Sequence, residues 1–360
     1  MDVLISGAGI AGPCLAWWLL QDGHRATIVE KAPRFRPGGY VIDFWGKGYD
    51  LAERMGLMPR LEQVGYHVNE VRFVDAKGRR RGGFDVSVLD RITHRRFITV
   101  PRGELSRAIF EAVEDRCETI FGDQIASLEL DRDGTGVTLE HGGKRFFDLV
   151  VGAEGIHSRT RELLFGPEDR FERFLGYNFA AFTLHGFPRR DPAGTPIPHG
   201  EAAQKALIRE RFAGMDWEVP AFLEGLEAAD DLYFDRVSQI RMEHWHQGDV
   251  ALLGDAAYAP SFLAGQGSAL AMIGGYVLAG ELKRAEGDVP VALANYQRRL
   301  FAFMRMKQDA AIKLAPTFVP NSNLGLLTRM IASRLLGIPW FADWVMGRSI
   351  QDQIELPDYF

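Results

Sequence analysis

A carboxylate and a glycine-rich turn lie a few residues apart in the C-terminal half of the chain. Asp255 follows the apolar run 250–253, which is typical of a strand buried on both faces. The turn-rich segment 260–267 comes next, and we expect Ser268 to cap the helix that follows it. A carboxylate accepts hydrogen bonds from hydroxyl groups, and a helix N-terminus offers free N–H groups to an anion. This spacing predicts that the stretch holds two parts of one ligand.

A second pattern at the start of the chain indicates the kind of ligand. Gly7, Gly9 and Gly12 form the pattern G-x-G-x-x-G between an apolar run and the predicted helix 14–21. In this context Gly7 permits a tight turn, Gly9 lets a pyrophosphate approach the backbone, and Gly12 lets the helix pack on the strand. Glu30 ends the next apolar run, where an acidic residue accepts hydrogen bonds from a ribose. We prefer a dinucleotide site to an ordinary strand–turn–helix because the strand, the helix and the spaced acid all occur together.

Three motifs together resemble those of the single-component FAD-dependent aromatic hydroxylases. These are the class A flavoprotein monooxygenases, a para-hydroxybenzoate hydroxylase-like family that includes the tetracycline-inactivating monooxygenases. The first motif is the fingerprint with Glu30 and Lys31, the second resembles the family's D-G motif at 148–161, and the third resembles its G-D motif at 254–267. They occur in the family's order, and the likeness spans roughly residues 1–300. Together they are specific for the family but not for a substrate.

The resemblance implies an α/β fold with two domains and C-terminal helices. We expect a Rossmann-type, GR2-like FAD-binding domain with an inserted antiparallel-sheet substrate domain. The expected boundaries place the FAD-binding domain at 1–66, 98–168 and 242–300, the substrate domain at 67–97 and 169–241, and a C-terminal helical region at 301–360.

The resemblance also implies which residues bind the cofactor. Asp43 lies in the segment that borders the isoalloxazine ring in the family, although an exposed loop acid is an equally good interpretation. Arg102 matches an R-x-x-L pattern at the start of a predicted helix, where the family has an arginine that contacts the flavin and its phosphates; a surface arginine is the alternative. Glu154 stands where the family usually has Asp, and Tyr258 where it often has His. The full set is Gly7, Gly9, Ala11, Gly12, Glu30, Lys31, Asp43, Arg102, Asp255, Pro260, Ala264, Gly265, Gln266 and Gly267.

Hydroxylation of a phenolic or polycyclic aromatic compound is the function that the resemblance implies. NAD(P)H would reduce FAD, O₂ would add to the flavin, and a flavin C4a-hydroperoxide would deliver one oxygen atom to the ring. Since the cofactor supplies the difficult step, no side chain is predicted as a catalytic acid or base, and no metal-ligand cluster is predicted. Two alternatives remain open: a flavin-dependent reductase or dehydrogenase without oxygen insertion, and a flavin-binding protein without turnover.

Composition narrows the possible partners and compartment. The net charge of -6 argues against nucleic acid as a partner, and no apolar run approaches the roughly 18 residues of a membrane span. Cys14 and Cys117 form no C-x-x-C pair, which favours a cytoplasmic protein without a redox dithiol. The chain begins directly in a predicted strand, so we expect no signal peptide. A monomer and a homodimer are both compatible with the sequence.

One segment departs from the family pattern. Residues 186–200 contain four prolines and three glycines, which exclude the interior of a sheet. The strand predicted at 171–184 then has two strong candidate partners, 66–74 and 232–240. We therefore expect either a chain gap near 185–200 or a substrate pocket open to solvent on that side.

Overall fold

The structure is a computed structural model, and it describes most of the chain. It describes residues 1–35, 40–75, 77–86, 90–91, 93–132, 134–182, 200–216, 218–229, 232–318, 325 and 354–360, with the backbone alone for 314–318. The predictions for the segment 186–199 and for residues 319–324 and 326–353 of the expected C-terminal helical region lie outside these residues.

A six-stranded sheet forms the centre of the molecule. Its order is β14-β15-β11-β1-β2-β7, and all neighbours are parallel except β14, which runs antiparallel to β15. The inner strands are apolar on both faces, as expected of a parallel sheet with both faces covered. The strands are β1 (Asp2–Ser6), β2 (Arg25–Glu30), β7 (Glu118–Phe121), β11 (Leu149–Gly152), β14 (His246–Gln247) and β15 (Val250–Leu252).

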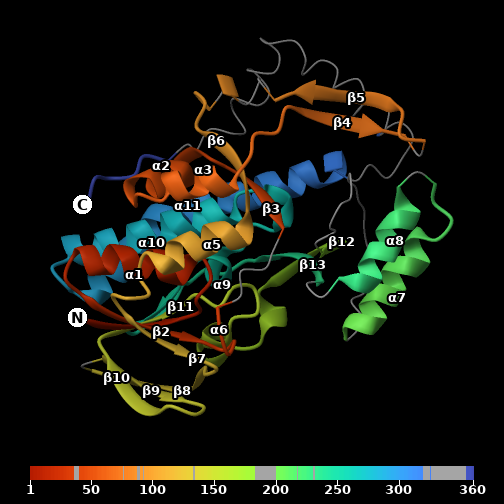
Figure 1. Ribbon diagram of the computed structural model, residues 1–360. Helices are drawn as coiled ribbons and strands as arrows, with labels where there is room; N and C mark the ends of the chain where they lie inside the picture. The colour runs from red at the N-terminus through yellow and green to blue at the C-terminus, as the bar shows by residue number, and fades with distance from the viewer. Residues whose placement is uncertain are drawn as a thin grey trace.

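Different layers cover the two faces of this sheet. Figure 1 shows α1 (Ala11–Gln21), α5 (Arg102–Glu111) and α10 (Gly267–Arg284) together on one face, where α1 packs against both other helices. The three-stranded antiparallel sheet β10-β9-β8 lies against the other face. Successive residues of β1 alternate between the two cores: Val3 and Ile5 join the helical side, and Leu4 joins the sheet side. The strands of the smaller sheet are β8 (Ile125–Asp131), β9 (Gly134–Leu139) and β10 (Gly143–Phe147).

Three two-stranded antiparallel sheets complete the strands that the structure describes. The pairs are β3 with β6, β4 with β5, and β12 with β13. The predicted pairing of 171–184 with 232–240 is confirmed by β12 and β13, but β4 pairs with β5 and not with β12, so the other candidate pairing was wrong. Their bounds are β3 (Val41–Trp45), β4 (Glu70–Val74), β5 (Arg80–Asp85), β6 (Phe97–Pro101), β12 (Glu172–Ala181) and β13 (Tyr233–Ile240).

The remaining helices surround these sheets. Figure 1 shows α7 and α8 beyond the β12–β13 pair and α11 behind α10, against which it packs. Their bounds are α2 (Gly46–Arg54), α3 (Met58–Val64), α6 (Arg159–Phe165), α7 (Glu201–Phe212), α8 (Val219–Ala228), α9 (Asp255–Tyr258) and α11 (Val289–Phe318), with short 3₁₀ helices at Glu168–Arg170 and Phe262–Ala264.

The predicted fold class is confirmed. A parallel sheet, separate antiparallel sheets and C-terminal helices are all present, whereas the domain boundaries remain a prediction. Ser268 is not the helix cap that the sequence predicts. Helix α10 begins at Gly267, with Gln266 at the N-cap position and no side-chain cap. Among the described helices, none is both long and apolar enough to cross a membrane.

Candidate cofactor and substrate site

The turn between β1 and α1 has the shape that the glycine pattern predicts. Gly7 has φ 110°, and a Cβ there would lie 2.6 Å from the carbonyl oxygen of Ala153. A Cβ on Gly12 would overlap the carbonyl oxygen of Gly7, so this position also requires glycine. A Cβ on Gly9 would meet no heavy atom within 4 Å. The fold itself therefore requires the first and third glycines, while the second leaves open space above the backbone that a ligand can fill.

Glu30 lies at the end of β2 and faces this turn. Its Oε2 accepts a hydrogen bond from the Ala8 N–H at 2.9 Å, and its Oε1 accepts one from the Ala32 N–H at 2.9 Å. The structure thus brings Glu30 to the glycine loop and orients its carboxylate there. Lys31 is exposed beside it, and Ala11 is buried as the first residue of α1.

Asp255 lies at the other side of the site as the first residue of α9. A Cβ on Gly267 would lie 3.8 Å from the Oδ1 of Asp255, so the carboxylate is next to the start of α10. Burial raises the pKa of Asp255, and the positive charge of Arg102 partly opposes that rise. No donor to this carboxylate is found in the part of the chain that the structure describes. A half-buried carboxylate without a donor among the described residues fits a ligand that brings its own hydroxyl groups.

Arg102 begins α5 where several elements converge. Its N–H donates to the carbonyl oxygen of Tyr40 at 2.9 Å, just before β3. Its side-chain charge acts on the titration of Tyr40, Tyr233 and Asp255, which places it among β3, β13 and α9. Asp43 in β3 is exposed and accepts a hydrogen bond from the Thr99 hydroxyl at 2.7 Å. Arg102 is therefore close to Asp255, whereas Asp43 is anchored to β6.

The loop between α9 and α10 has an irregular backbone that neighbouring side chains hold. Gly265 adopts a left-handed conformation with φ 63°, and the non-glycine Ser261 has φ 82°. Gln239 of β13 donates from Nε2 to the Pro260 carbonyl oxygen at 2.9 Å. From α11, Gln308 donates to the Ala259 carbonyl oxygen at 3.1 Å, and Lys307 donates to Gln266 Oε1 at 2.7 Å. Ala264 lies in the same loop, and Gly267 is the first residue of α10.

The sequence did not indicate these three supporting side chains. Gln239, Lys307 and Gln308 are all buried, but polar residues in a strand or a long helix ordinarily face solvent. No local motif marks them, because each reaches the loop from a distant part of the chain.

Four aromatic rings form a surface beside Arg102, which we call the aromatic wall: Tyr40, Phe179, Tyr233 and Phe262. The rings of Phe179 and Phe262 stack with centroids 3.8 Å apart, and Tyr40 packs edge-on against both at 5.1 and 4.9 Å. Phe262 is 40% exposed and Tyr233 is 41% exposed, although both belong to this cluster. Such a surface can stack against a planar apolar ligand.

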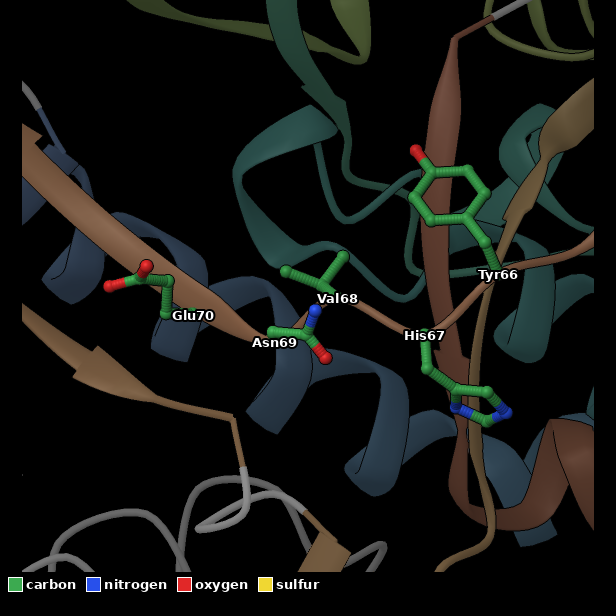
Figure 2. Close-up of a pocket in the computed structure, with 5 residues that line it drawn as sticks. All are labelled: Tyr66, His67, Val68, Asn69 and Glu70. Carbon is green, nitrogen blue, oxygen red and sulfur yellow. The ribbon is translucent and has the colours of Figure 1, made fainter.

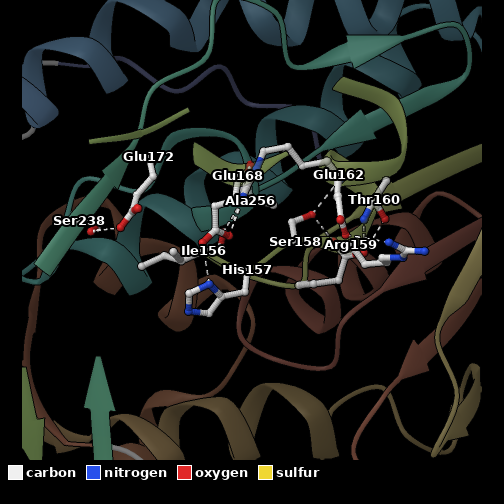
Figure 3. Close-up of polar contacts among 12 residues, drawn as sticks. Ile156, His157, Ser158, Arg159, Thr160, Glu162, Glu168, Glu172, Ser238 and Ala256 are labelled. Atoms are coloured by element: carbon white, nitrogen blue, oxygen red, sulfur yellow. Dashed lines mark hydrogen bonds and ion pairs between the residues drawn. The ribbon is translucent and has the colours of Figure 1, made fainter. Parts of the chain in front are cut away.

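The segment after β11, which resembles the D-G motif, is mainly a structural clamp (Figure 3). Glu154 accepts hydrogen bonds from the Ser158 hydroxyl at 2.6 Å and from the Thr160 N–H at 3.1 Å, so its carboxylate organises the start of α6. Arg161 is buried and donates to the Ala256 carbonyl oxygen at 3.1 Å and to Glu168 at 2.7 Å. Arg161 thereby joins α6 to α9, and Glu154 is already occupied by its own segment.

A further pocket lies away from these residues. It has a volume of about 270 Å³ and is lined by residues 66–70, which connect α3 to β4. Figure 2 shows that the Tyr66 and His67 side chains extend from this segment in different directions. None of the predicted site residues lines it.

Comparison with known proteins defines the class to which this fold and site belong. A family model described as an FAD binding domain matches residues 1–185. An uncharacterised protein of Mycobacterium tuberculosis is 35% identical over 346 residues, covering 85% of this chain and 91% of that protein. A flavin-dependent monooxygenase from an unknown prokaryotic organism is 31% identical over 361 residues, covering 89% of this chain and 91% of that protein. The solved structure of the tetracycline destructase Tet(51) matches with a TM-score of 0.80 and 28% identity, covering 99% of each chain.

The fold and the matched domain define an FAD-binding oxidoreductase. More specifically, the chain belongs to the FAD-dependent monooxygenases of the aromatic hydroxylase class. The predicted family, enzyme class and FAD cofactor are thereby confirmed, whereas the individual site residues remain predictions.

Proposed function

We propose that this enzyme uses NAD(P)H and O₂ to hydroxylate a phenolic or polycyclic aromatic compound at the aromatic wall. The observation that carries the proposal is the position of this partly exposed cluster of rings beside Arg102, whose charge acts on both Tyr40 and Asp255. A planar substrate would stack on these rings and be held near the cofactor.

The proposed cofactor contacts follow from the geometry of the two loops. The open backbone at Gly9 would receive the pyrophosphate, and Glu30 would accept hydrogen bonds from the adenosine ribose. Asp255 would accept hydrogen bonds from further hydroxyl groups of FAD, and Arg102 would contact its phosphates or ring. When bound, FAD supplies the redox chemistry that activates dioxygen.

The protein's own contribution is orientation and electrostatics. The loop 259–267 and the N-terminus of α10 would lie along the pyrimidine edge of the flavin, where N–H groups and the helix dipole favour negative charge. The β12–β13 pair would cover the ring and keep water from it. In this proposal the expected domain boundaries hold, with β12 and β13 in the substrate domain, and the protein acts as a monomer or homodimer.

The substrate class rests on the relatives as well as on the rings. One neighbour at 28% identity is a tetracycline destructase, and another at 29% identity is Tet(55), a second tetracycline destructase. These two neighbours, together with the cluster of four rings in the aromatic wall, favour a polycyclic substrate for this chain.

NAD(P)H oxidation with and without candidate phenols tests the proposal, with peroxide release measured in parallel. Hydroxylation predicts substrate-stimulated NAD(P)H oxidation with little peroxide. Substrate reduction without use of O₂ would support a reductase instead, and the absence of any stimulated oxidation across a broad aromatic panel would overturn the proposal.

A further inference from the structure

Tyr233 of the aromatic wall has a hydroxyl group whose proton is already bound inside the protein. Its O–H donates to Asp235 Oδ2 at 3.1 Å, and this hydrogen bond is exposed. Burial and the negative charge of Asp235 raise the pKa of Tyr233, so the hydroxyl keeps its proton at neutral pH. A tyrosine hydroxyl has one proton to donate, and its oxygen also accepts hydrogen bonds. The Tyr233 oxygen can therefore accept a further hydrogen bond but has no second proton to donate.

Asp235 is fixed in the orientation that binds this proton. Its Oδ1 accepts a hydrogen bond from the Arg236 N–H at 2.7 Å, and its Oδ2 also lies 3.4 Å from His157 Nε2. Burial favours the neutral form of Asp235, but the hydrogen bonds from His157 and the Arg236 N–H outweigh it and lower the pKa of this carboxyl group. Because Asp235 stays charged and both of its oxygen atoms have partners, it remains an acceptor for Tyr233.

The Tyr233 ring places its hydroxyl beside the proposed substrate position. The ring centroid is 6.2 Å from those of Tyr40 and Phe179, and Tyr233 is 41% exposed. The charge of Arg102 acts on Tyr233 as it does on Asp255 of the proposed cofactor site. The hydroxyl groups of a planar aromatic molecule project from its rim. A molecule stacked on the aromatic wall can therefore bring such a group to the Tyr233 oxygen.

We propose that Tyr233 selects substrates with a free phenolic O–H by accepting a hydrogen bond from it, and that Asp235 is the positioning residue that makes Tyr233 an acceptor. The inference rests on the proposed function, because it requires the substrate to lie on the aromatic wall. A phenol brings the proton that the Tyr233 oxygen lacks, whereas its methyl ether brings only another acceptor. The ether would leave two oxygen atoms facing each other without a proton between them, which disfavours its binding.

Binding of matched pairs, each a planar phenol and its methyl ether, to the purified holoenzyme tests this inference. Naphthol and methoxynaphthalene are one such pair, and the change in flavin absorption measures the two dissociation constants. We expect the wild type to bind the phenol about tenfold more tightly than the ether. Tyr233→Phe keeps the ring but removes the acceptor, so the two affinities should become nearly equal through weaker binding of the phenol.

Asp235→Ala separates the hydrogen bond from the space that the ether needs. It keeps the Tyr233 hydroxyl but frees its proton, so Tyr233 can then donate to the ether oxygen. The two affinities should again become nearly equal, now through tighter binding of the ether, which a merely structural role for Asp235 would not produce.

Tyr40→Phe is the matched control, because it also removes one hydroxyl group from the aromatic wall. No hydrogen-bond partner of the Tyr40 hydroxyl lies among the residues that the structure describes, so this group can donate or accept. Tyr40→Phe should therefore leave the ratio of the two affinities unchanged.

Three results would overturn the inference. Equal affinity of the wild type for phenols and ethers would do so while leaving the proposed function intact, because substrate-stimulated NAD(P)H oxidation measures hydroxylation separately. A wild-type ratio that persists in Tyr233→Phe or in Asp235→Ala would also overturn it. Failure of both members of every pair to bind would overturn the aromatic wall as the substrate site, and this inference with it.

Discussion

His157 Nε2 lies 3.4 Å from Asp235 Oδ2, which joins the segment after β11 to strand β13. The other ring nitrogen of His157 is 2.9 Å from Glu168 Oε1 (Figure 3). One imidazole therefore lies between two carboxylates from different elements. Asp235 in turn accepts a hydrogen bond from the Tyr233 hydroxyl at 3.1 Å. The segment after β11 and the aromatic wall are therefore connected through His157.

The His157 contacts predict a specific pH dependence of stability. The two carboxylates raise the pKa of His157 from 6.5 to about 10, and the pKa values of Glu168 and Asp235 fall below 4.5 and 3.8. The histidine's contribution is complete below pH 6.5 and is lost as the pH rises through about 10, while the carboxylates' contribution is lost on acidification below about 4.5. Because the ring is 61% exposed, solvent screening should keep the effect small.

We expect His157→Gln to lower the Tm most between pH 5 and 6.5, by a few degrees at most, and to have no effect near pH 10 and above. Thermal unfolding of the wild type and of His157→Gln between pH 5 and about 10 measures this difference in Tm. A difference that grows toward alkaline pH would contradict the assigned contacts.

Asp255 is predicted to bind FAD, and its buried charge is predicted to lower the stability of the protein without FAD. Asp255→Asn should weaken FAD binding by about 1.5–3 kcal/mol for each hydrogen bond to the charged carboxylate, or about tenfold or more. Burial raises the pKa of Asp255 above 3.8, so ionisation above that pH disfavours folding. The Asn apoprotein should therefore unfold at an equal or higher temperature at pH 7.

Asp43→Asn is the control for this measurement, since Asp43 is exposed and already accepts a hydrogen bond from Thr99. Flavin fluorescence titration of both variants gives the two affinities. Equal loss of FAD in the two variants would contradict the assigned geometry.

The glycine loop gives a matched pair of substitutions with opposite consequences. Gly9→Ala places a Cβ in open space, so the apoprotein should keep its Tm while the pyrophosphate loses its approach and FAD affinity falls at least tenfold. Gly12→Ala forces a Cβ onto the Gly7 carbonyl oxygen and should destabilise the apoprotein by about 1–3 kcal/mol. Calorimetry without FAD and titration with FAD separate the two effects. A stable, FAD-binding Gly9→Ala protein would refute the proposed role of this loop.

Phe262 is predicted to bind substrate and not cofactor. Phe262→Ala removes a 40% exposed ring that stacks on Phe179, so the KM for an aromatic substrate should rise several-fold with little change in FAD affinity. Phe146→Ala, which removes a 53% exposed ring from β10, should change neither quantity. A loss of FAD with unchanged KM would place Phe262 at the cofactor instead.

The sequence predicted those parts of the site that are local in the chain. Gly7, Gly12 and Glu30 act within one strand–turn–helix–strand unit, where a fixed spacing dictates their positions. The strand pair β12–β13 was also predicted, because both segments contain aromatic residues, which favour strands.

The support for the loop 259–267 could not be predicted in the same way. Lys307 and Gln308 reach it from α11, and Gln239 reaches it from β13, through contacts that join residues 21 to 49 positions apart. Nothing in their local sequence distinguishes a buried polar side chain from a solvated one. The expected cap at Ser268 failed because Gly265 takes a left-handed conformation and α10 starts at Gly267.

Incorporation of isotopically labelled dioxygen tests the monooxygenase function most directly. The holoenzyme is incubated with NAD(P)H, labelled O₂ and a panel of phenolic and polycyclic aromatic compounds, and the products are analysed by mass spectrometry. We expect at least one compound to gain a single labelled oxygen atom, with Phe262→Ala slowing the reaction at low substrate concentration. Consumption of NAD(P)H with only labelled peroxide formed, or with a reduced product lacking the label, would contradict the assignment of this enzyme as an aromatic hydroxylase.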